Sequence, residues 1–426
     1  MKRHTAIATL SIGAAAGLAL SSCAVSSGED DAGETVLTIA WQSGTNNAND
    51  EIIARFEEEH PGVTVELTTA SDDDLQKTVR TQLLAGTAPD LFMVWPGSAN
   101  VLSVGELGPE GFLAPLDDLP WASQATEGAL DAASADGHVY MATAAIDSSG
   151  AIYNMGTMNE LDLSVPTTWS ELLQLCQDAR DLGKTAFGLG LQEVWTTRLV
   201  PSAFVANEID DVAAFNASLA DGTFDFSTSA EWRTALERQN EMVDAGCFND
   251  SPVGTSMDNA VLPGVLDGDF LATVSVGAHI GVMMDPESGD PEAEFLMAPL
   301  PSSDDPDASR INVLYNNGIG INADSEKLEL AMEFVELWTS EWALNLTAAE
   351  KNLVPSIPNE DFAPSPALAQ VLEFTAEDRV AGGDWTPGAK TFSAMTDGVQ
   401  AVLLGSATIQ DALDSMQAAY LEGLER

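Results

Sequence analysis

The strongest constraint on the fold is an alternation of apolar strands and amphipathic helices near the start of the chain. Residues 36–41, 63–67 and 91–94 are short apolar or alternating runs that predict strands. The segments between them, residues 46–60 and 72–84, have apolar side chains at helical spacing and end at glycine or proline. This order predicts a parallel α/β sheet with right-handed crossovers, and ligands bind beyond the carboxyl ends of such strands.

The rest of the chain adds further helices and strands, so we expect more than one domain. With 426 residues and 45% hydrophobic content, the chain is long enough for two or three domains. The patterns predict helices over residues 231–245, 325–340 and 391–424, the last broken at a glycine. Residues 270–276 and 295–299 are expected to be strands.

The first 34 residues are typical of an exported lipoprotein. A short basic start and an apolar run at residues 6–20 precede Cys23, so residues 1–22 are predicted to be a signal peptide. A cysteine directly after small residues matches the bacterial lipobox, in which the sulfur is lipidated. Residues 23–34 are then the lipidated Cys23 and a flexible tether. We therefore expect a soluble domain held at the outer face of the membrane by lipid alone.

The charge of the chain limits its partners. Sixteen Lys and Arg stand against 67 Asp and Glu, which gives a formal net charge of −51. Such a surface repels nucleic acid and disfavours anionic ligands. The acids either keep the protein soluble in salty or acidic surroundings or attract a cation such as Ca²⁺ or a polyamine. Their spread along the whole chain favours the first explanation.

Two cysteines remain once Cys23 is lipidated. Cys176 and Cys247 form an even pair outside the cytoplasm, which favours a disulfide closing a long loop. Whether their Cα atoms come close enough is a question that only the fold answers.

Several segments together resemble a known family. In order along the chain they are residues 56–65 (FEEEHPGVTV), 85–92 (AGTAPDLF), 136–140 (DGHVY), 153–154 (YN) and 166–172 (PTTWSEL). In this order and behind a lipobox, they resemble the carbohydrate-binding, maltose-binding-protein-like solute-binding proteins of ABC importers. The similarity runs from about residue 37 to the end of the chain.

The resemblance implies an α/β fold of two lobes joined by a hinge, with the ligand in the cleft between them. We expect residues 35–145 plus 300–345 in lobe 1 and residues 146–299 plus 346–426 in lobe 2. The implied protein is a monomer that captures a mono- or oligosaccharide and delivers it to membrane permease subunits. It is not an enzyme and uses no cofactor or metal.

A sugar site needs flat aromatic rings beside carboxylates and amides, because sugars have apolar C–H faces and many hydroxyls. Four tryptophans lie where loops are expected, which are Trp41, Trp95, Trp195 and Trp385. Ordinary core packing is the alternative for each of them. Core packing is a weaker explanation where the neighbouring residues are polar, as they are around Trp41 and Trp385.

The resemblance assigns roles position by position. Asp147 and Glu193 would accept hydrogen bonds from hydroxyls, assisted by Gln42. Trp95, Trp195 and either Trp385 or Phe392 would stack on sugar rings. Where relatives often have a further tryptophan, this chain has Ala278 or His279, so one stacking ring is missing. His279 is either a hydrogen-bond donor or a structural histidine, and Asn316 is a possible hinge or ligand amide.

Three other functions are compatible with parts of the sequence. The chain has no Gly-x-Ser-x-Gly, no His-Glu-x-x-His and no phosphate-binding Gly-Lys loop. A secreted glycoside hydrolase needs only two carboxylates, so the composition alone permits one. The same fold could also bind a polyamine or a metal cation through acids and aromatics. A purely structural surface protein would show no ligand-dependent closure.

Overall fold

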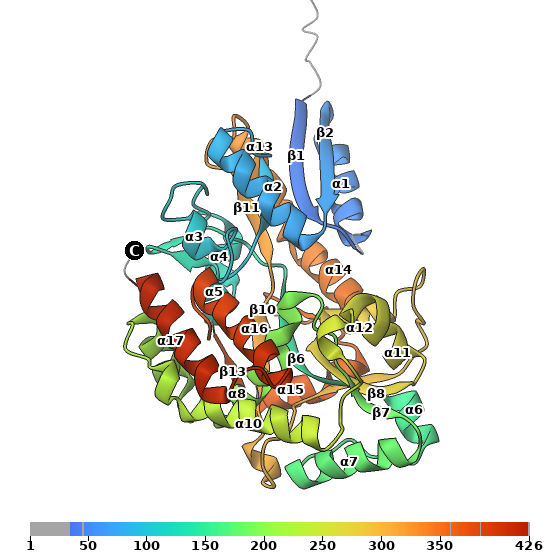
Figure 1. Ribbon diagram of the computed structural model, residues 1–426. Helices are drawn as coiled ribbons and strands as arrows, with labels where there is room; N and C mark the ends of the chain where they lie inside the picture. Colours follow the sequence, from blue (N-terminus) through green and yellow to red (C-terminus); the bar gives the residue numbers. More distant parts are fainter. Residues whose placement is uncertain (1–34, 45–46, 358, 384, 425–426) are drawn as a thin grey trace, which may run out of the picture.

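The computed structural model describes residues 35–44, 47–357, 359–383 and 385–424. The predicted signal peptide, Cys23 and the tether lie outside this part of the chain. Within the described part, strands and helices form two large sheets, each covered by helices, so the predicted α/β class is confirmed (Figure 1). A third sheet has only the two short strands β4 (Ser134–Ala135) and β5 (His138–Val139). None of the described helices combines the length and the apolar character that a membrane crossing requires.

The first sheet is built as the N-terminal pattern predicts. Its strand order is β11-β3-β1-β2, and β1 pairs in parallel with both β2 and β3. The strands are β1 (Thr35–Gln42), β2 (Val63–Ala70), β3 (Leu91–Val94) and β11 (Gly318–Ile321). The helices of this lobe are α1 (Asn47–Glu59), α2 (Asp72–Ala85), α3 (Val104–Leu107), α4 (Pro120–Gln124), α5 (Glu127–Ala132) and α13 (Leu328–Trp338). Figure 1 shows α1 and α2 beside β1 and β2 at the top.

The second sheet has the order β13-β10-β6-β8-β7, with β9 and β12 also paired to β6. The strands are β6 (Ala145–Asn154), β7 (Thr185–Gly188), β8 (Phe270–Val276), β9 (Phe295–Ala298), β10 (Ile311–Tyr315), β12 (Val354–Pro355) and β13 (Val380–Gly382). β7 is parallel to β8, β13 is parallel to β10, and β6 runs antiparallel to its neighbours.

Helices surround the second sheet and form the larger part of this lobe (Figure 1). They are α6 (Met155–Glu160), α7 (Trp169–Asp181), α8 (Leu199–Glu208), α9 (Val212–Ala220), α10 (Ala230–Asp244), α11 (Leu262–Leu266), α12 (Ala278–Met283), α15 (Ala369–Ala376), α16 (Ala389–Leu403) and α17 (Ile409–Leu424). Short 3₁₀ and π turns include η1 (Val194–Arg198) and η4 (Met257–Val261). α14 (Glu341–Lys351) lies between the two lobes in Figure 1.

Three segments carry the chain from one lobe to the other. Ala142 bridges Ile319 of β11 just before β6 begins, and residues 316–317 link β10 directly to β11. The third segment leads from α14, whose Ala343 and Leu344 belong to the first core, to β12 in the second sheet. Three adjacent crossings are the arrangement that a hinge between lobes requires.

One boundary differs from the expected division of the lobes. The strand β10 pairs with β6 and β13, so residues 311–315 lie in the second sheet rather than with lobe 1. The expectation put the crossing at residue 300, whereas the chain crosses at residues 316–317. Strand pairing joins β10 to residues far away in the sequence, so hydrophobic periodicity carries no sign of it.

Two of the larger apolar cores correspond to the two lobes. Trp121, Phe56 and Phe92 are fully buried in the first, and Trp232 and Phe204 in the second. Cys176 of α7 and Cys247 form a disulfide with Cα atoms 4.8 Å apart, across a separation of 71 residues. This is the pairing that the cysteine count favoured, and it ties α7 to the segment that follows α10.

Candidate functional site

The ends of the strands bring most of the predicted site residues to one edge of each sheet. In the first sheet, Gln42 ends β1, Trp95 follows β3, and Asn316 precedes β11. In the second sheet, residues 189–195 follow β7, residues 277–279 follow β8, and residues 383–388 follow β13. The antiparallel β6 begins at the same edge, since its Ser149 is paired with Val276 at the end of β8. These are the edges at which α/β sheets bind ligands.

A hydrogen bond between the lobes shows that these edges face each other. Gly388, at the start of α16, donates its N–H to Ser98 Oγ of the loop after β3 at 3.2 Å. Burial and Asp73 raise the pKa of Asp72 at the start of α2, and the charge of Asp258 in the second lobe adds to this shift. The predicted residues at these two edges therefore lie on the sides of the lobes that face each other, whereas Trp41 and Trp385 are buried within the lobes.

Asp147 is a buried carboxylate at the hinge end of β6. Its Oδ1 accepts hydrogen bonds from the N–H groups of Ser148 at 2.6 Å and Gly277 at 2.8 Å. Burial raises the pKa of Asp147 to about 6, although these hydrogen bonds oppose the shift. A Cβ on Gly277 would lie 2.8 Å from Asp147 Oδ1, so only glycine allows this approach. The N–H of Ala278 also donates to this carboxylate, so backbone groups of three residues hold Asp147 in place.

Glu193 lies just before η1, and its carboxylate supports a neighbouring loop. Its Oε1 accepts from Ser256 Oγ at 2.5 Å, and Oε2 accepts from the N–H of Met257 at 2.7 Å. The carboxylate therefore binds the N-terminal turn of η4, where negative charge is favourable. Each oxygen keeps a further lone pair, so Glu193 can still accept from a ligand.

Trp195 and His279 form an aromatic pair between η1 and α12. Their ring centroids are 5.7 Å apart, and Trp195 is partly exposed whereas His279 is buried. Ser275 Oγ lies 2.6 Å from His279 Nδ1. Burial lowers the pKa of His279 to about 4, so the ring is neutral at physiological pH. His279 thus has a structural partner on one nitrogen, while Nε2 faces Asp258 at 3.9 Å.

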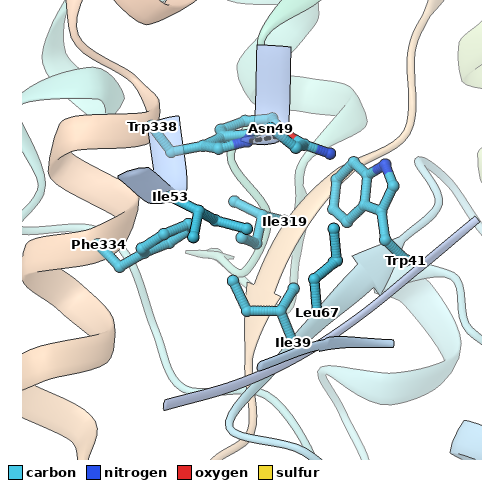
Figure 2. A pocket seen from close by; sticks show the side chains of 8 residues that line it. All are labelled: Ile39, Trp41, Asn49, Ile53, Leu67, Ile319, Phe334 and Trp338. Atoms are coloured by element: carbon cyan, nitrogen blue, oxygen red, sulfur yellow. Dashed lines mark hydrogen bonds between the residues drawn. The ribbon is translucent and has the colours of Figure 1, made fainter. Parts of the chain in front are cut away.

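Trp41 was predicted to lie in a loop at the site, and this prediction is wrong. Trp41 belongs to β1, is 3% exposed, and packs edge-on against Trp338 of α13. Figure 2 shows it beside a small apolar pocket of the first lobe, where Trp338 Nε1 donates to Asn49 Oδ1 at 3.1 Å. Successive side chains along a strand point to opposite faces of the sheet. Trp41 therefore points into the core, whereas Gln42, the last residue of β1, does not.

Trp385 is also packed inside the protein, contrary to the loop exposure that was expected. Its ring is 5% exposed, contacts Phe215 edge-on, and donates from Nε1 to Asn216 Oδ1 at 3.1 Å. Phe392, in the first turn of α16, is partly exposed, and the Arg198 guanidinium lies 5.9 Å from its ring centroid. Of these two alternatives for a stacking ring, Phe392 is the one with accessible surface.

The remaining predicted residues, Trp95, Gln42 and Asn316, are partly exposed at the first-lobe edge. Trp95 is held by two backbone hydrogen bonds, one to Leu102 and one from Val104. The backbone carbonyl of Asn316 lies 3.0 Å from Thr143 Oγ1, and its side-chain oxygen accepts from the N–H of Asn317. Asn316 is therefore built into the hinge.

Three charged residues near the site were missed by the sequence analysis. Burial raises the pKa of Asp72, and repulsion from Asp73 and Asp258 adds to the shift. Burial and the charge of Glu193 raise the pKa of Asp258. Lys351, the last residue of α14, interacts with Asp72 and Asp147. The position of Asp72 directly after a predicted parallel strand was the signal that could have identified it.

Over the described ranges, no group of three or more His, Cys, Asp or Glu side chains has the arrangement of a metal site. The arrangement instead combines aromatic rings with separated carboxylates and one ammonium group. Such a surface binds polar organic molecules that also have apolar faces.

Residues 42–343 match the bacterial extracellular solute-binding protein family, and this is more than half of the chain. The chain belongs to this family. Two curated relatives match part of the solute-binding protein. The multiple sugar-binding protein of Streptococcus mutans is 26% identical over 146 residues, 34% of each chain. A putative binding protein of Brucella abortus is 28% identical over 185 residues, 42% of this chain and 43% of that one.

The chain thus spans between a third and a half of the length of these curated relatives. Solved structures match over nearly its whole length. One, from work on xylan utilization by Caldanaerobius polysaccharolyticus, has a TM-score of 0.79 and 18% identity over 90% of this solute-binding protein and 99% of that chain. RafE in complex with raffinose has a TM-score of 0.74 and 20% identity over 90% and 98%. This likeness confirms the two-lobed fold.

Proposed function

We propose that this protein is the substrate-binding component of an ABC importer and captures a mono- or oligosaccharide between its lobes. The observation that carries the proposal is that both strand-end edges face each other beside the hinge, with Trp195 and Asp147 on the second-lobe edge and Asp72 on the first-lobe edge. Family membership and the name of the Streptococcus mutans relative support it. So do the names of neighbours described with raffinose, stachyose and cycloalternan.

The chemistry of the junction suits a sugar. Asp147 accepts hydrogen bonds from ligand hydroxyls through the carboxylate lone pairs that its three backbone donors do not use. Trp195 offers a partly exposed ring for the apolar face of a sugar, and Phe392 and Trp95 offer two more. Gln42 and Asn316 add amides at the first-lobe edge. A ligand that contacts both edges stabilises the closed arrangement of the lobes.

The closed, loaded form delivers the sugar to two membrane permease subunits, while other chains hydrolyse ATP. The protein itself acts by binding rather than catalysis. Lipid on Cys23 would hold it at the outer face of the membrane as a monomer, with residues 24–34 as the tether. This anchor keeps the binding site near the permease.

A thermal-shift screen tests the ligand class. The protein without residues 1–23 would be screened against mono- and oligosaccharides, spermidine, putrescine and Ca²⁺. A ligand at a hundred times its dissociation constant should add about 2.7 kcal/mol to the free energy of unfolding. We expect a saturable shift with one sugar series, confirmed by titration calorimetry. A shift with polyamine or Ca²⁺ alone would overturn the sugar assignment.

The lipid anchor has a separate test. Mass spectrometry of the protein expressed from its own leader in a bacterial host should find an acylated Cys23 as the first residue. A Cys23→Ala variant should leave the membrane fraction. A protein cleaved elsewhere, without acyl chains, would overturn the anchor and leave the ligand proposal intact.

A further inference from the structure

One hydrogen bond joins the lobes outside the three segments that cross between them. Gly388, the residue before the first turn of α16, donates its N–H to Ser98 Oγ at 3.2 Å. Ser98 lies in the loop between β3 and α3 of the first lobe, whereas α16 packs in the core of the second. The contact can therefore form only when the two lobes are close together at the edges of the site.

The first lobe holds Ser98 in a fixed place. Gly97, directly before it, donates to the carbonyl of Ala132 at 3.2 Å and accepts from the N–H of Gly105 at 2.8 Å. A Cβ on Gly105 would lie 3.0 Å from both Gly97 O and Ser98 Cβ, so glycine at this position lets α3 approach the loop closely. The Ser98 hydroxyl is thus presented by a loop that is tied to α3 and to the end of α5.

The second lobe has no side chain of its own for the Gly388 N–H. In a capping box, the third residue of a helix accepts from the N–H of the cap residue. α17 has this arrangement, since Asp411 Oδ2 accepts from the N–H of Thr408 at 2.9 Å. The third residue of α16 is Thr391, whose buried Oγ1 has no hydrogen-bond partner among the described residues. Ser98 of the other lobe takes the place of that side chain.

Gly388 connects this contact to a ring of the proposed site. Its φ of +79° lies in the left-handed region that favours glycine. Its carbonyl accepts the first hydrogen bond of α16, from the N–H of Phe392 at 3.1 Å. Phe392 is the partly exposed ring proposed to stack on a sugar. Ser98 therefore binds the residue on which the turn carrying Phe392 is built.

We propose that Ser98 is a positioning residue that caps α16 across the lobe boundary, so that closure of the lobes and placement of Phe392 occur together. This inference rests on the proposed function and adds a control of the same site. The hydrogen bond exists in the closed arrangement and is replaced by water in the open one, so it favours closure by its net value. A hydrogen bond between neutral groups shifts such an equilibrium by about 2- to 10-fold. Ser98 acts without touching the sugar.

The kinetic test compares serine variants of the full chain, kept in a detergent without a sugar headgroup. Ser98→Ala removes the acceptor. With the sugar found by the screen, stopped-flow measurements should give about 2- to 10-fold faster dissociation for Ser98→Ala. The association rate should be unchanged, because the sugar enters the open lobes before the contact forms. Ser98→Thr keeps the hydroxyl and should restore the wild-type rate.

A matched control is available in the same lobe. Ser123 is exposed on α4, and its Oγ donates to Pro120 O at 2.9 Å. Ser123→Ala should leave both rate constants as in wild type. If Ser98→Ala lowers the melting temperature yet releases the sugar at the wild-type rate, Ser98 is merely structural and the inference is overturned.

The Gly388 amide reports on the contact directly. Pro–Gly steps occur at residues 61–62, 96–97, 263–264 and 387–388, so ¹³C-carbonyl proline with ¹⁵N glycine labels only these amides. Pro387→Ala removes the Gly388 signal and so assigns it. Solvent exchange of this amide should be faster in Ser98→Ala than in wild type, and saturating sugar should slow it in wild type. Equal exchange in Ser98→Ala and wild type would overturn the inference.

The same signal separates the possible failures. If Ser98→Ala does not fold, wild type alone suffices, and exchange of the Gly388 amide that saturating sugar leaves unchanged would overturn the inference. If wild type binds no sugar, the proposed function is overturned. The Ser98 contact is then still tested, because the comparison of Gly388 exchange between wild type and Ser98→Ala needs no ligand.

Discussion

Thr143 Oγ1 lies 3.0 Å from the carbonyl oxygen of Asn316, and this contact joins two of the three chain segments that cross between the lobes. The third crossing is attached at the same residue, because Ser356 Oγ donates to Thr143 O at 2.6 Å. Trp121 Nε1 also donates to Thr143 O, at 3.1 Å. Thr143 is fully buried. The crossings therefore form one connected hinge rather than three independent linkers.

Removing the hydroxyl of this hinge should loosen it. Thr143→Val keeps the shape of the side chain but leaves Asn316 O without this donor. We expect the free energy of unfolding to fall by about 1–3 kcal/mol in urea titrations. The sugar-free protein should also become more open, with a larger radius of gyration in solution scattering. Thr143→Ser restores the hydroxyl and should restore both values, and a valine variant equal to wild type in both would contradict this role.

Asp147 should make sugar binding depend on pH. Its pKa of about 6 means that it is ionised at neutral pH and protonated at lower pH, where it loses an acceptor. We expect the affinity for sugar to fall by up to about tenfold per unit as the pH drops below 6. Calorimetry between pH 5 and 8 measures this. Asp147→Asn should bind weakly, with a flatter profile. An unchanged profile in that variant would assign the dependence to another group.

The raised pKa of Asp147 also makes the free energy of unfolding depend on pH. The folded protein retains the Asp147 proton up to a pH of about 6, whereas the unfolded chain releases it near 4. The contribution of Asp147 to the free energy of unfolding therefore falls as the pH rises from about 4 to about 6. Above that window it stays constant. Urea titrations of wild type and Asp147→Asn should differ in slope only within this window.

Trp195 should supply stacking energy rather than stability. Its ring is partly exposed beside His279, so Trp195→Ala should weaken sugar binding by more than about 1 kcal/mol without unfolding the protein. Trp342 is a matched control, since it is 37% exposed under the Arg55 guanidinium on α14. Trp342→Ala should leave the affinity unchanged. Wild-type affinity in Trp195→Ala would remove Trp195 from the site.

The disulfide should stabilise the second lobe. It closes a separation of 71 residues between Cys176 and Cys247, both fully buried. Reduction should lower the free energy of unfolding by about 2–4 kcal/mol, mainly through a less constrained unfolded chain. Urea titration with and without reductant measures the loss. A double alanine variant should be insensitive to reductant. Equal stability of wild type in both conditions would contradict the prediction.

The local elements were predictable because their signals are local. Thr168 accepts from the N–H of Glu171 at the start of α7, and Gly86 ends α2 in the left-handed conformation, as helix caps predict. Thr408 and Asp411 cap α17 after the break at residue 405. Each of these interactions lies within four residues of sequence, so composition and periodicity are sufficient to find it.

The site was only partly predictable, because its members come from segments far apart in the chain. Asp147, His279 and Trp195 were found through resemblance, and the ends of β6, β8 and β7 place them at one edge. Asp72 and Lys351 had no motif of their own. Trp41 was wrongly expected in a loop because its neighbours in the sequence are polar. Those neighbours do not indicate that α13 covers its side of β1.

The sequence by itself determined the alternation of strands and helices, the caps and the resemblance to solute-binding proteins. These depend on residue type and spacing over short distances. The sequence favoured a disulfide between Cys176 and Cys247, which the fold decided by bringing their Cα atoms to 4.8 Å. The tertiary structure alone decided that β10 joins the second sheet, that Trp41 is core, and that Asp147 is buried at the hinge end of β6. Burial, pKa and hydrogen-bond partners arise only when distant segments pack together, and no local pattern records which segments those are.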